Sequence, residues 1–131
     1  HPGTGVSVTG TKGPEVNLEK LCEGIGIKDI TVISAFDLET VESTIRRCVE
    51  TDEPSVIIAR GPCALREKIK GTPFEIDADS CIQCHECLDV GCPAICITGE
   101  DINIDPAVCV GPACGVCAQV CPSEAIVEMK R

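Results

Sequence analysis

The spacing of apolar residues predicts a helix, a strand, a second helix and a second strand within the first sixty residues. Residues 1–17 lack any period and are expected to form a loop. The first helical stripe consists of Leu18, Leu21, Cys22 and Ile25. The second helical stripe consists of Leu38, Val41, Ile45, Cys48 and Val49. Residues 29–36 and 55–60 are short runs rich in β-branched residues, as is typical of buried strands.

Polar residues mark where these helices should begin and end. Asn17 and Asp37 are the expected N-caps, and Gly24 or Gly26 is the expected stop of the first helix. The strand–helix–strand order implies two parallel strands joined by a right-handed crossover. A parallel sheet is covered on both faces, which two helices and two strands cannot achieve alone. We therefore expect this region to be one end of a larger α/β domain, completed by other polypeptide.

The second half of the chain has a different pattern, with very short strands between groups of cysteines. Residues 74–77 are expected to pair with residues 125–130, and residues 95–105 to form a hairpin that bends at Gly99. The predicted domains are residues 1–72, an α/β module, and residues 73–131, a small α+β module.

Composition and charge narrow the function classes. The net charge of −10 argues against nucleic acid as a partner, because phosphate backbones attract Lys and Arg. Residues 71–131 contain ten acidic residues but only Lys130 and Arg131 as bases, which again indicates two modules. No apolar run approaches the roughly 20 residues of a membrane-spanning helix. No secretory signal is visible at the start, so a cytoplasmic location is expected.

The 12 cysteines of this chain carry the strongest chemical signal. Eight of them form two groups, each followed by proline: Cys81, Cys84, Cys87 and Cys92, then Cys109, Cys114, Cys117 and Cys121. This is close to the C-x2-C-x2-C-x3-C-P spacing, repeated twice, of proteins that bind two iron–sulfur clusters. Disulfides are a poorer explanation, because cysteine triplets this tight are hard to pair without strain. Structural zinc prefers two separated C-x2-C pairs and four ligands in all.

In the two-cluster pattern, the fourth cysteine of each group binds the cluster of the other group. One [4Fe-4S] cluster is thus expected on Cys81, Cys84, Cys87 and Cys121. The other is expected on Cys92, Cys109, Cys114 and Cys117. The fourth cysteine of each group is expected on a crossover helix, which the extra residue before Cys92 would lengthen. Two extra residues after Cys109 make it the ligand that the pattern supports least.

The remaining candidates receive simpler interpretations. Cys22 and Cys48 lie on apolar helix faces and are expected in the core. Cys63 and Cys96 are expected to be buried structural thiols, with a reactive Cys63 as the alternative. His85 is expected to be a solvated side chain, with a charge near the cluster as the alternative. The two strands end at residues 34–36 and at the segment RGPC, residues 60–63, at the sheet edge where ligands gather. These strand ends are either part of a cofactor or partner site or a plain connection. The plain connection is preferred.

Taken together, the stretches HPGTG, LCEGIGIKDITVISAFDLETVE, PSVIIARGPCAL, GCPAI and CGVCAQVCP resemble the carboxyl-terminal part of the large subunit of indolepyruvate ferredoxin oxidoreductases. The resemblance implies that the first module ends a thiamine-diphosphate-binding domain and that the second is a bacterial-ferredoxin-like domain. It implies oxidative decarboxylation of an aryl pyruvate, with coenzyme A taking the acyl group and electrons passing through the clusters to ferredoxin. The implied partners are the remainder of the large subunit, a smaller subunit and external ferredoxin.

One departure limits what this chain is expected to do. The G-D-G…N segment that holds magnesium and diphosphate in this family is absent here and is expected upstream of residue 1. No catalytic residue is assigned, and the chain alone is not expected to be catalytically competent. A free-standing two-cluster electron carrier with an α/β docking module is the alternative. A structural metal module is a third, weaker interpretation.

Overall fold

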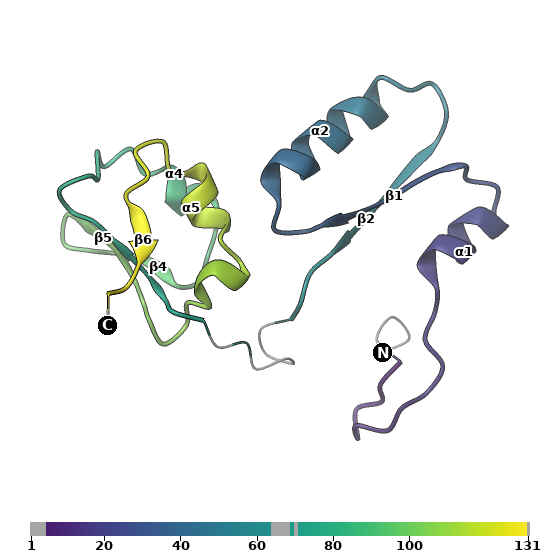
Figure 1. Cartoon of the computed structure of the whole chain (residues 1–131), viewed down its shortest axis with the longest axis horizontal. Coiled ribbons are helices and arrows are strands. Elements are labelled where there is room, and N and C mark those ends of the chain that lie inside the picture. Colours follow the sequence, from purple (N-terminus) through teal and green to yellow (C-terminus); the bar gives the residue numbers. More distant parts are fainter. Residues whose placement is uncertain (1–4, 64–68, 70, 131) are drawn as a thin grey trace. The chain divides into compact units, whose positions relative to one another are not determined.

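The computed structural model describes residues 5–63, 69 and 71–130. The chain divides into two compact units, His1–Arg60 and Gly61–Arg131 (Figure 1). Among the described residues, the first unit has one two-stranded sheet and the second has two. This division lies upstream of the predicted boundary after residue 72, so the described residues 61–63, 69, 71 and 72 group with the cysteine-rich half. The assignment of residues 1–72 and 73–131 to two functional domains stays a prediction.

The first unit contains the four predicted elements in the predicted order. They are α1 (Leu18–Gly24), β1 (Asp29–Ser34), α2 (Leu38–Val49) and β2 (Ser55–Arg60). The strands β1 and β2 pair in parallel, with Asp29 opposite Ser55 and Ser34 opposite Arg60. The βαβ unit expected from the sequence is therefore confirmed.

The two helices begin at the predicted caps. The Asn17 side chain accepts a hydrogen bond from the Lys20 backbone N–H at 2.7 Å. Asp37 Oδ1 accepts one from the Thr40 N–H at 3.1 Å, and its Oδ2 accepts one from the Thr40 hydroxyl at 2.6 Å. Each cap satisfies an N–H group that has no partner within the helix, which fixes where the helix starts.

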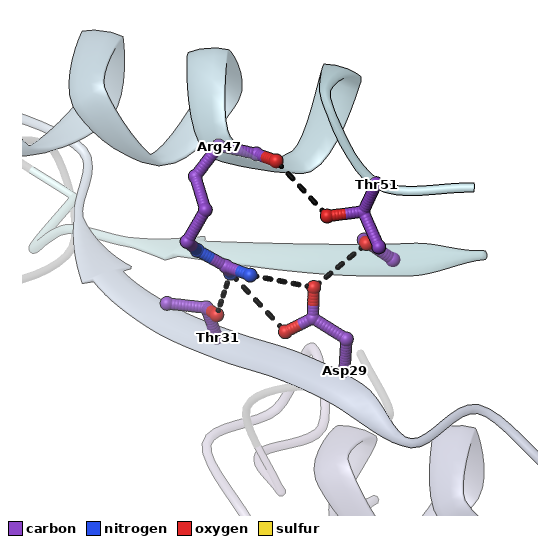
Figure 2. Close-up of polar contacts among 5 residues, drawn as sticks. Asp29, Thr31, Arg47 and Thr51 are labelled. Carbon is purple, nitrogen blue, oxygen red and sulfur yellow. Dashed lines mark hydrogen bonds and ion pairs between the residues drawn. The ribbon is translucent and has the colours of Figure 1, made fainter. Parts of the chain in front are cut away.

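Arg47 of α2 forms hydrogen bonds with side chains on one face of the sheet. Arg47 donates from Nη1 to Asp29 Oδ2 at 2.8 Å and from Nη2 to Asp29 Oδ1 at 3.1 Å, a two-pronged contact (Figure 2). Its Nη2 also donates to the Thr31 hydroxyl at 2.8 Å, while Ser55 Oγ donates to Asp29 Oδ2 at 2.7 Å. The pKa of Asp29 is lowered, mainly by the hydrogen bond from Arg47.

The short helix α1 approaches the other face of the same sheet. Arg60, at the end of β2, forms an ion pair with Glu19 of α1 at 2.8 Å. Arg60 is in register with Ser34, whereas Asp29 and Thr31 lie at alternate positions of β1. Because successive strand residues point to opposite faces, α1 and α2 lie on opposite sides of β1 and β2.

Much of the apolar surface of this unit is open to solvent. Among its described residues only Ile33, Ile58 and Thr44 are buried. Ile25 of the first predicted stripe is 72% exposed, and Val49 of the second is 79% exposed. The sequence thus predicted the helices and their apolar faces correctly, but no described element covers most of those faces.

The second unit is built from short elements around its cysteines. In order they are β3 (Phe74–Ile76), α4 (Glu86–Asp89), β4 (Ile95–Thr98), β5 (Asp101–Ile104), the 3₁₀-helix η2 (Gly111–Ala113), α5 (Val116–Val120) and β6 (Ile126–Glu128). The strands β3 and β6 pair antiparallel, as do β4 and β5, which confirms both predicted pairings. Gly99 at the β4–β5 bend has a φ of +68°, which glycine adopts without strain.

The core of this unit combines two isoleucines and a phenylalanine with two thiols. Its buried members are Phe74, Cys87, Ile102, Cys117 and Ile126. None of the helices that the structure describes is long and apolar enough to cross a membrane.

The expectation that the fourth cysteine of each group lies on a helix was wrong. The third cysteine does so instead: Cys87 lies in α4 and Cys117 in α5. Cys121 directly follows α5, and Cys92 follows Gly91, whose φ of +66° takes the chain out of the helix. The extra residue before Cys92 therefore extends the connection after α4 and not the helix itself.

Candidate metal centres

Four cysteines from both groups meet around one cavity of the second unit. Cys81, Cys84 and Cys87 of the first group line it together with Cys121 of the second. The cavity measures about 310 Å³, including space open to solvent. Its other walls are mostly apolar, formed by Ile76, Ile82, His85, Ile102, Ser123, Ala125 and Ile126. The fourth cysteine thus joins the triplet of the other group, in the arrangement that the crosswise pattern predicts.

The electrostatics of Cys87 reflect this gathering of sulfur atoms. Burial raises the pKa of the Cys87 thiol, and the charges of Cys121, Cys84 and Cys81 raise it further. Like charges disfavour ionisation, so several thiolates at one place need a cationic centre to offset their repulsion. The side chains that act on Cys87 are the other three members of its predicted set.

The other three cysteines of the second predicted set act electrostatically on Cys117 in the same way. Burial, followed by the charges of Cys109, Cys92 and then Cys114, raises the pKa of the Cys117 thiol to about 11. Cys92 belongs by sequence to the first group, so this set is also crosswise. The structure brings together both predicted sets of four, while ligation itself stays a prediction.

Backbone N–H groups reach the sulfur atoms of two of these cysteines. Cys121 Sγ accepts from the Ala125 N–H at 3.3 Å and lies 3.7 Å from the Ser123 hydroxyl. Burial alone would raise the pKa of Cys121, but these hydrogen bonds lower it overall. Cys109 Sγ accepts from the N–H groups of Phe74 and Gly111, each at 3.4 Å. Such donors stabilise thiolates, which are the form that binds metal.

The donors present fit iron–sulfur clusters. A [4Fe-4S] cluster is held by four cysteine thiolates, and each of the two sets offers four thiols. The first set surrounds a mostly apolar cavity, which would limit solvent access to a bound cluster. Within the described ranges, no three His, Cys, Asp or Glu side chains are grouped closely enough to hold a single metal ion.

Two of the surplus cysteines are not where the sequence led us to expect them. Cys63 and Cys96 were predicted to be buried, but both are exposed. Cys63 follows β2 in an irregular segment. Cys96 pairs with Asn103 in the two-stranded β4–β5 ribbon, and both residues lie on a side of the ribbon that no described element covers. Cys22 and Cys48 are half-buried, which agrees only in part with a core position.

Other sequence candidates are placed as follows. His85 is exposed, as predicted, and lies at the edge of the first cavity. Most of the HPGTG motif, residues 1–4, and the end of RGPCAL, residues 64–65, lie outside the described residues. The sequence did not reveal the donors from Phe74, Gly111 and Ala125, because backbone donors leave no residue-type signal.

Comparison with curated proteins shows relatives along the whole chain. The chain is 35% identical to the indolepyruvate oxidoreductase subunit IorA of Archaeoglobus fulgidus over 137 aligned positions, covering 99% of this chain and 22% of that protein. It is 34% identical to IorA of Methanothermobacter marburgensis, covering 96% of this chain and 20% of that protein. The chain thus spans about a fifth of the length of these relatives.

A shorter match involves a second type of subunit. The pyruvate synthase subunit PorD of Methanothermobacter marburgensis is 46% identical over 59 residues, which cover 45% of this chain and 65% of PorD. No family model matches the chain, and no solved structure matches it. The resemblance inferred from the sequence motifs is confirmed by the IorA matches: nearly the whole chain is similar to about a fifth of the indolepyruvate oxidoreductase subunit IorA.

Proposed function

We propose that this chain is the electron-transfer segment of a 2-oxoacid ferredoxin oxidoreductase and holds two [4Fe-4S] clusters. The single observation that carries the proposal is the crosswise meeting of Cys81, Cys84 and Cys87 with Cys121 around one cavity. The relatives support it, because both IorA and PorD are named as subunits of enzymes that act on 2-oxoacids or form them.

Each part of the second unit has a role in this proposal. Cys81, Cys84, Cys87 and Cys121 hold the first cluster. Cys92, Cys109, Cys114 and Cys117 hold the second. When bound, each cluster accepts and passes on one electron at a time. Ile102 and Ile126 exclude water from the first site. The backbone N–H groups of Phe74 and Ala125 stabilise the negative sulfur atoms of Cys109 and Cys121, respectively.

The first unit is, in this proposal, one end of a thiamine-diphosphate-binding domain. Its exposed apolar side chains, such as Leu21 and Ile25, support this role, since a complete α/β domain buries such faces. The strands β1 and β2 each pair with a single neighbour among the described elements. Thiamine diphosphate and magnesium are held by parts of the subunit outside this sequence, so this chain alone is not catalytically competent.

The complete assembly would oxidise an aryl pyruvate such as indolepyruvate, with coenzyme A accepting the acyl group. The clusters pass the electrons to external ferredoxin. The partners of this chain are then the remainder of the large subunit and the smaller subunit, in the cytoplasm. The boundary between the thiamine domain and the ferredoxin-like domain lies after residue 72.

A free-standing electron carrier is the second candidate, because the cysteine-rich unit has its own core and forms a compact unit by itself. The two proposals differ in the first unit. If the exposed faces of α1 and α2 become protected from hydrogen exchange when the remainder of the subunit is added, the enzyme proposal is supported. If they stay exposed, the carrier proposal is supported.

The cluster assignment is tested on protein purified without oxygen. Iron and sulfide analysis should give about eight of each per chain, and the dithionite-reduced protein should show two interacting S = 1/2 signals by EPR. A protein without iron and with a silent spectrum would overturn the proposed function.

A further inference from the structure

The two residues inserted after Cys109 create the loop Val110–Ala113, which a distant segment covers. That segment is called the clasp below; it consists of Gly71, Thr72, Pro73 and Phe74, the last of which is the first residue of β3. A Cβ atom on Gly111 would overlap the carbonyl oxygen of Thr72. A Cβ on Gly71 would lie 2.5 Å from the carbonyl oxygen of Val110. The clasp and the loop therefore touch backbone to backbone, at a distance that only glycine permits at both positions.

The two ends of this contact are fixed independently. The Met129 N–H, just after β6, donates to the Pro73 carbonyl at 2.9 Å, and Phe74 is paired with Glu128 in the β3–β6 sheet. On the other side, Gly111 is buried and has a φ of +60°, so the loop adopts a turn that other residues resist. The clasp is thus fixed by its pairing with β6, and the loop that it contacts is fixed by the turn at Gly111.

This contact directs two donors at one sulfur atom. The Phe74 N–H at the end of the clasp and the Gly111 N–H in the loop both lie 3.4 Å from Cys109 Sγ. Cys109 is the cysteine whose position the insertion puts in doubt. We infer that the contact between the clasp and the loop, made at Gly71 and Gly111, positions Cys109 as a ligand of the second cluster. The same contact sets the two N–H···S hydrogen bonds that Cys109 Sγ accepts.

The inference rests on the proposed function, and it has a consequence for redox behaviour. N–H groups aimed at a ligand sulfur stabilise added negative charge, so they favour the reduced cluster. Opening the clasp removes at least the Phe74 donor. The potential of the second cluster should then fall, or that cluster should be lost, while the first cluster keeps its four ligands.

The test compares three variants of the full chain, each loaded anaerobically with ferrous iron and sulfide. Gly71→Ala introduces the steric clash without a positive φ, and Gly111→Ala introduces the clash together with one. Gly99→Ala is the matched control, because it has a φ of +68° but no atom within 4 Å of an added Cβ. Any effect of left-handed strain alone appears in this control.

Gly71→Ala and Gly111→Ala should hold about four iron atoms per chain instead of about eight, or keep eight with a lowered potential for one cluster only. The EPR signal should change from an interacting pair to a single isolated S = 1/2 species where one cluster is lost. Gly99→Ala should behave like the unmodified chain.

Two results would overturn the inference alone. The first is that both clasp variants keep about eight iron atoms with both potentials unchanged. The second is that Gly71→Ala loses both clusters together, since this would indicate general misfolding rather than a role at Cys109. An unmodified chain that binds no iron would overturn the proposed function and this inference with it.

Discussion

Ile126 offers a quantitative test of how tightly the second unit is packed around its first site. Its side chain is 7% exposed, belongs to the core with Phe74 and Ile102, and lines the cavity that Cys121 also lines. Truncating a buried isoleucine to alanine costs about 2–5 kcal/mol. We expect the lower end of this range, because Ile126 lies in a three-residue strand that pairs, among the described strands, only with β3, so neighbouring side chains can partly close the gap.

The consequence is measurable as the rate of cluster loss. If the stabilisation is absent from the transition state for unfolding, a loss of about 2 kcal/mol speeds unfolding roughly 30-fold. The assay follows the decay of cluster absorbance in a fixed concentration of urea, without oxygen. Val127→Ala is the control, since Val127 is the next residue of β6, points to the opposite face and is 37% exposed. If Ile126→Ala lost its clusters no faster than Val127→Ala, the packing described around the first cavity would be wrong.

Three further predictions concern the caps, the ion pair and the surplus thiols. Asn17→Ala should cost about 1 kcal/mol of helix stability and speed amide hydrogen exchange in α1 about fivefold. Asn17→Asp keeps a capping oxygen and should leave the exchange rate unchanged; equal exchange rates in the two variants would contradict the cap. The Asp29 carboxyl should titrate below 3.8 in an NMR experiment and move upward in Arg47→Gln. Because the pKa of Asp29 is lowered, its ion pair with Arg47 stabilises the fold above the unfolded pKa of 3.8, and this stabilisation is lost as the pH falls through the pKa of the folded protein. An Asp29 titration that Arg47→Gln leaves unmoved would refute the pairing. Iodoacetamide applied anaerobically to the iron-loaded protein should modify Cys63 and Cys96 first, and mass spectrometry showing them protected would contradict their exposure.

Local signals in the sequence were sufficient for the elements and for their pairing. The N-caps Asn17 and Asp37 act within one helical turn, so a local pattern contains all the information that places them. The β4–β5 hairpin depends in the same way on Gly99 at its bend. The crosswise sets of cysteines were also proposed from spacing alone, and they stay a prediction as cluster ligands.

What the sequence did not reveal depends on contacts between distant segments. Periodicity showed that Ile25 and Val49 lie on apolar faces, but it contains no information on what covers a face, and both are exposed here. The exposure of Cys96 has the same origin. A short apolar strand suggests burial, and the sequence does not show that the sheet of β4 contains only one other described strand. The contact of Gly71 with the Cys109 loop spans nearly forty residues and depends on the lack of a side chain, which no local pattern indicates.

Mapping of reactive thiols in Cys121→Ala tests the crosswise sharing of two cubane clusters most directly. The variant, loaded with iron and sulfide without oxygen, is treated briefly with iodoacetamide and digested for mass spectrometry. We expect Cys81, Cys84 and Cys87 to become reactive. The four cysteines of the second predicted set should stay protected: Cys92, Cys109, Cys114 and Cys117. Reactive Cys109, Cys114 and Cys117 beside a protected first triplet would show that each group binds its own cluster, and would contradict the account.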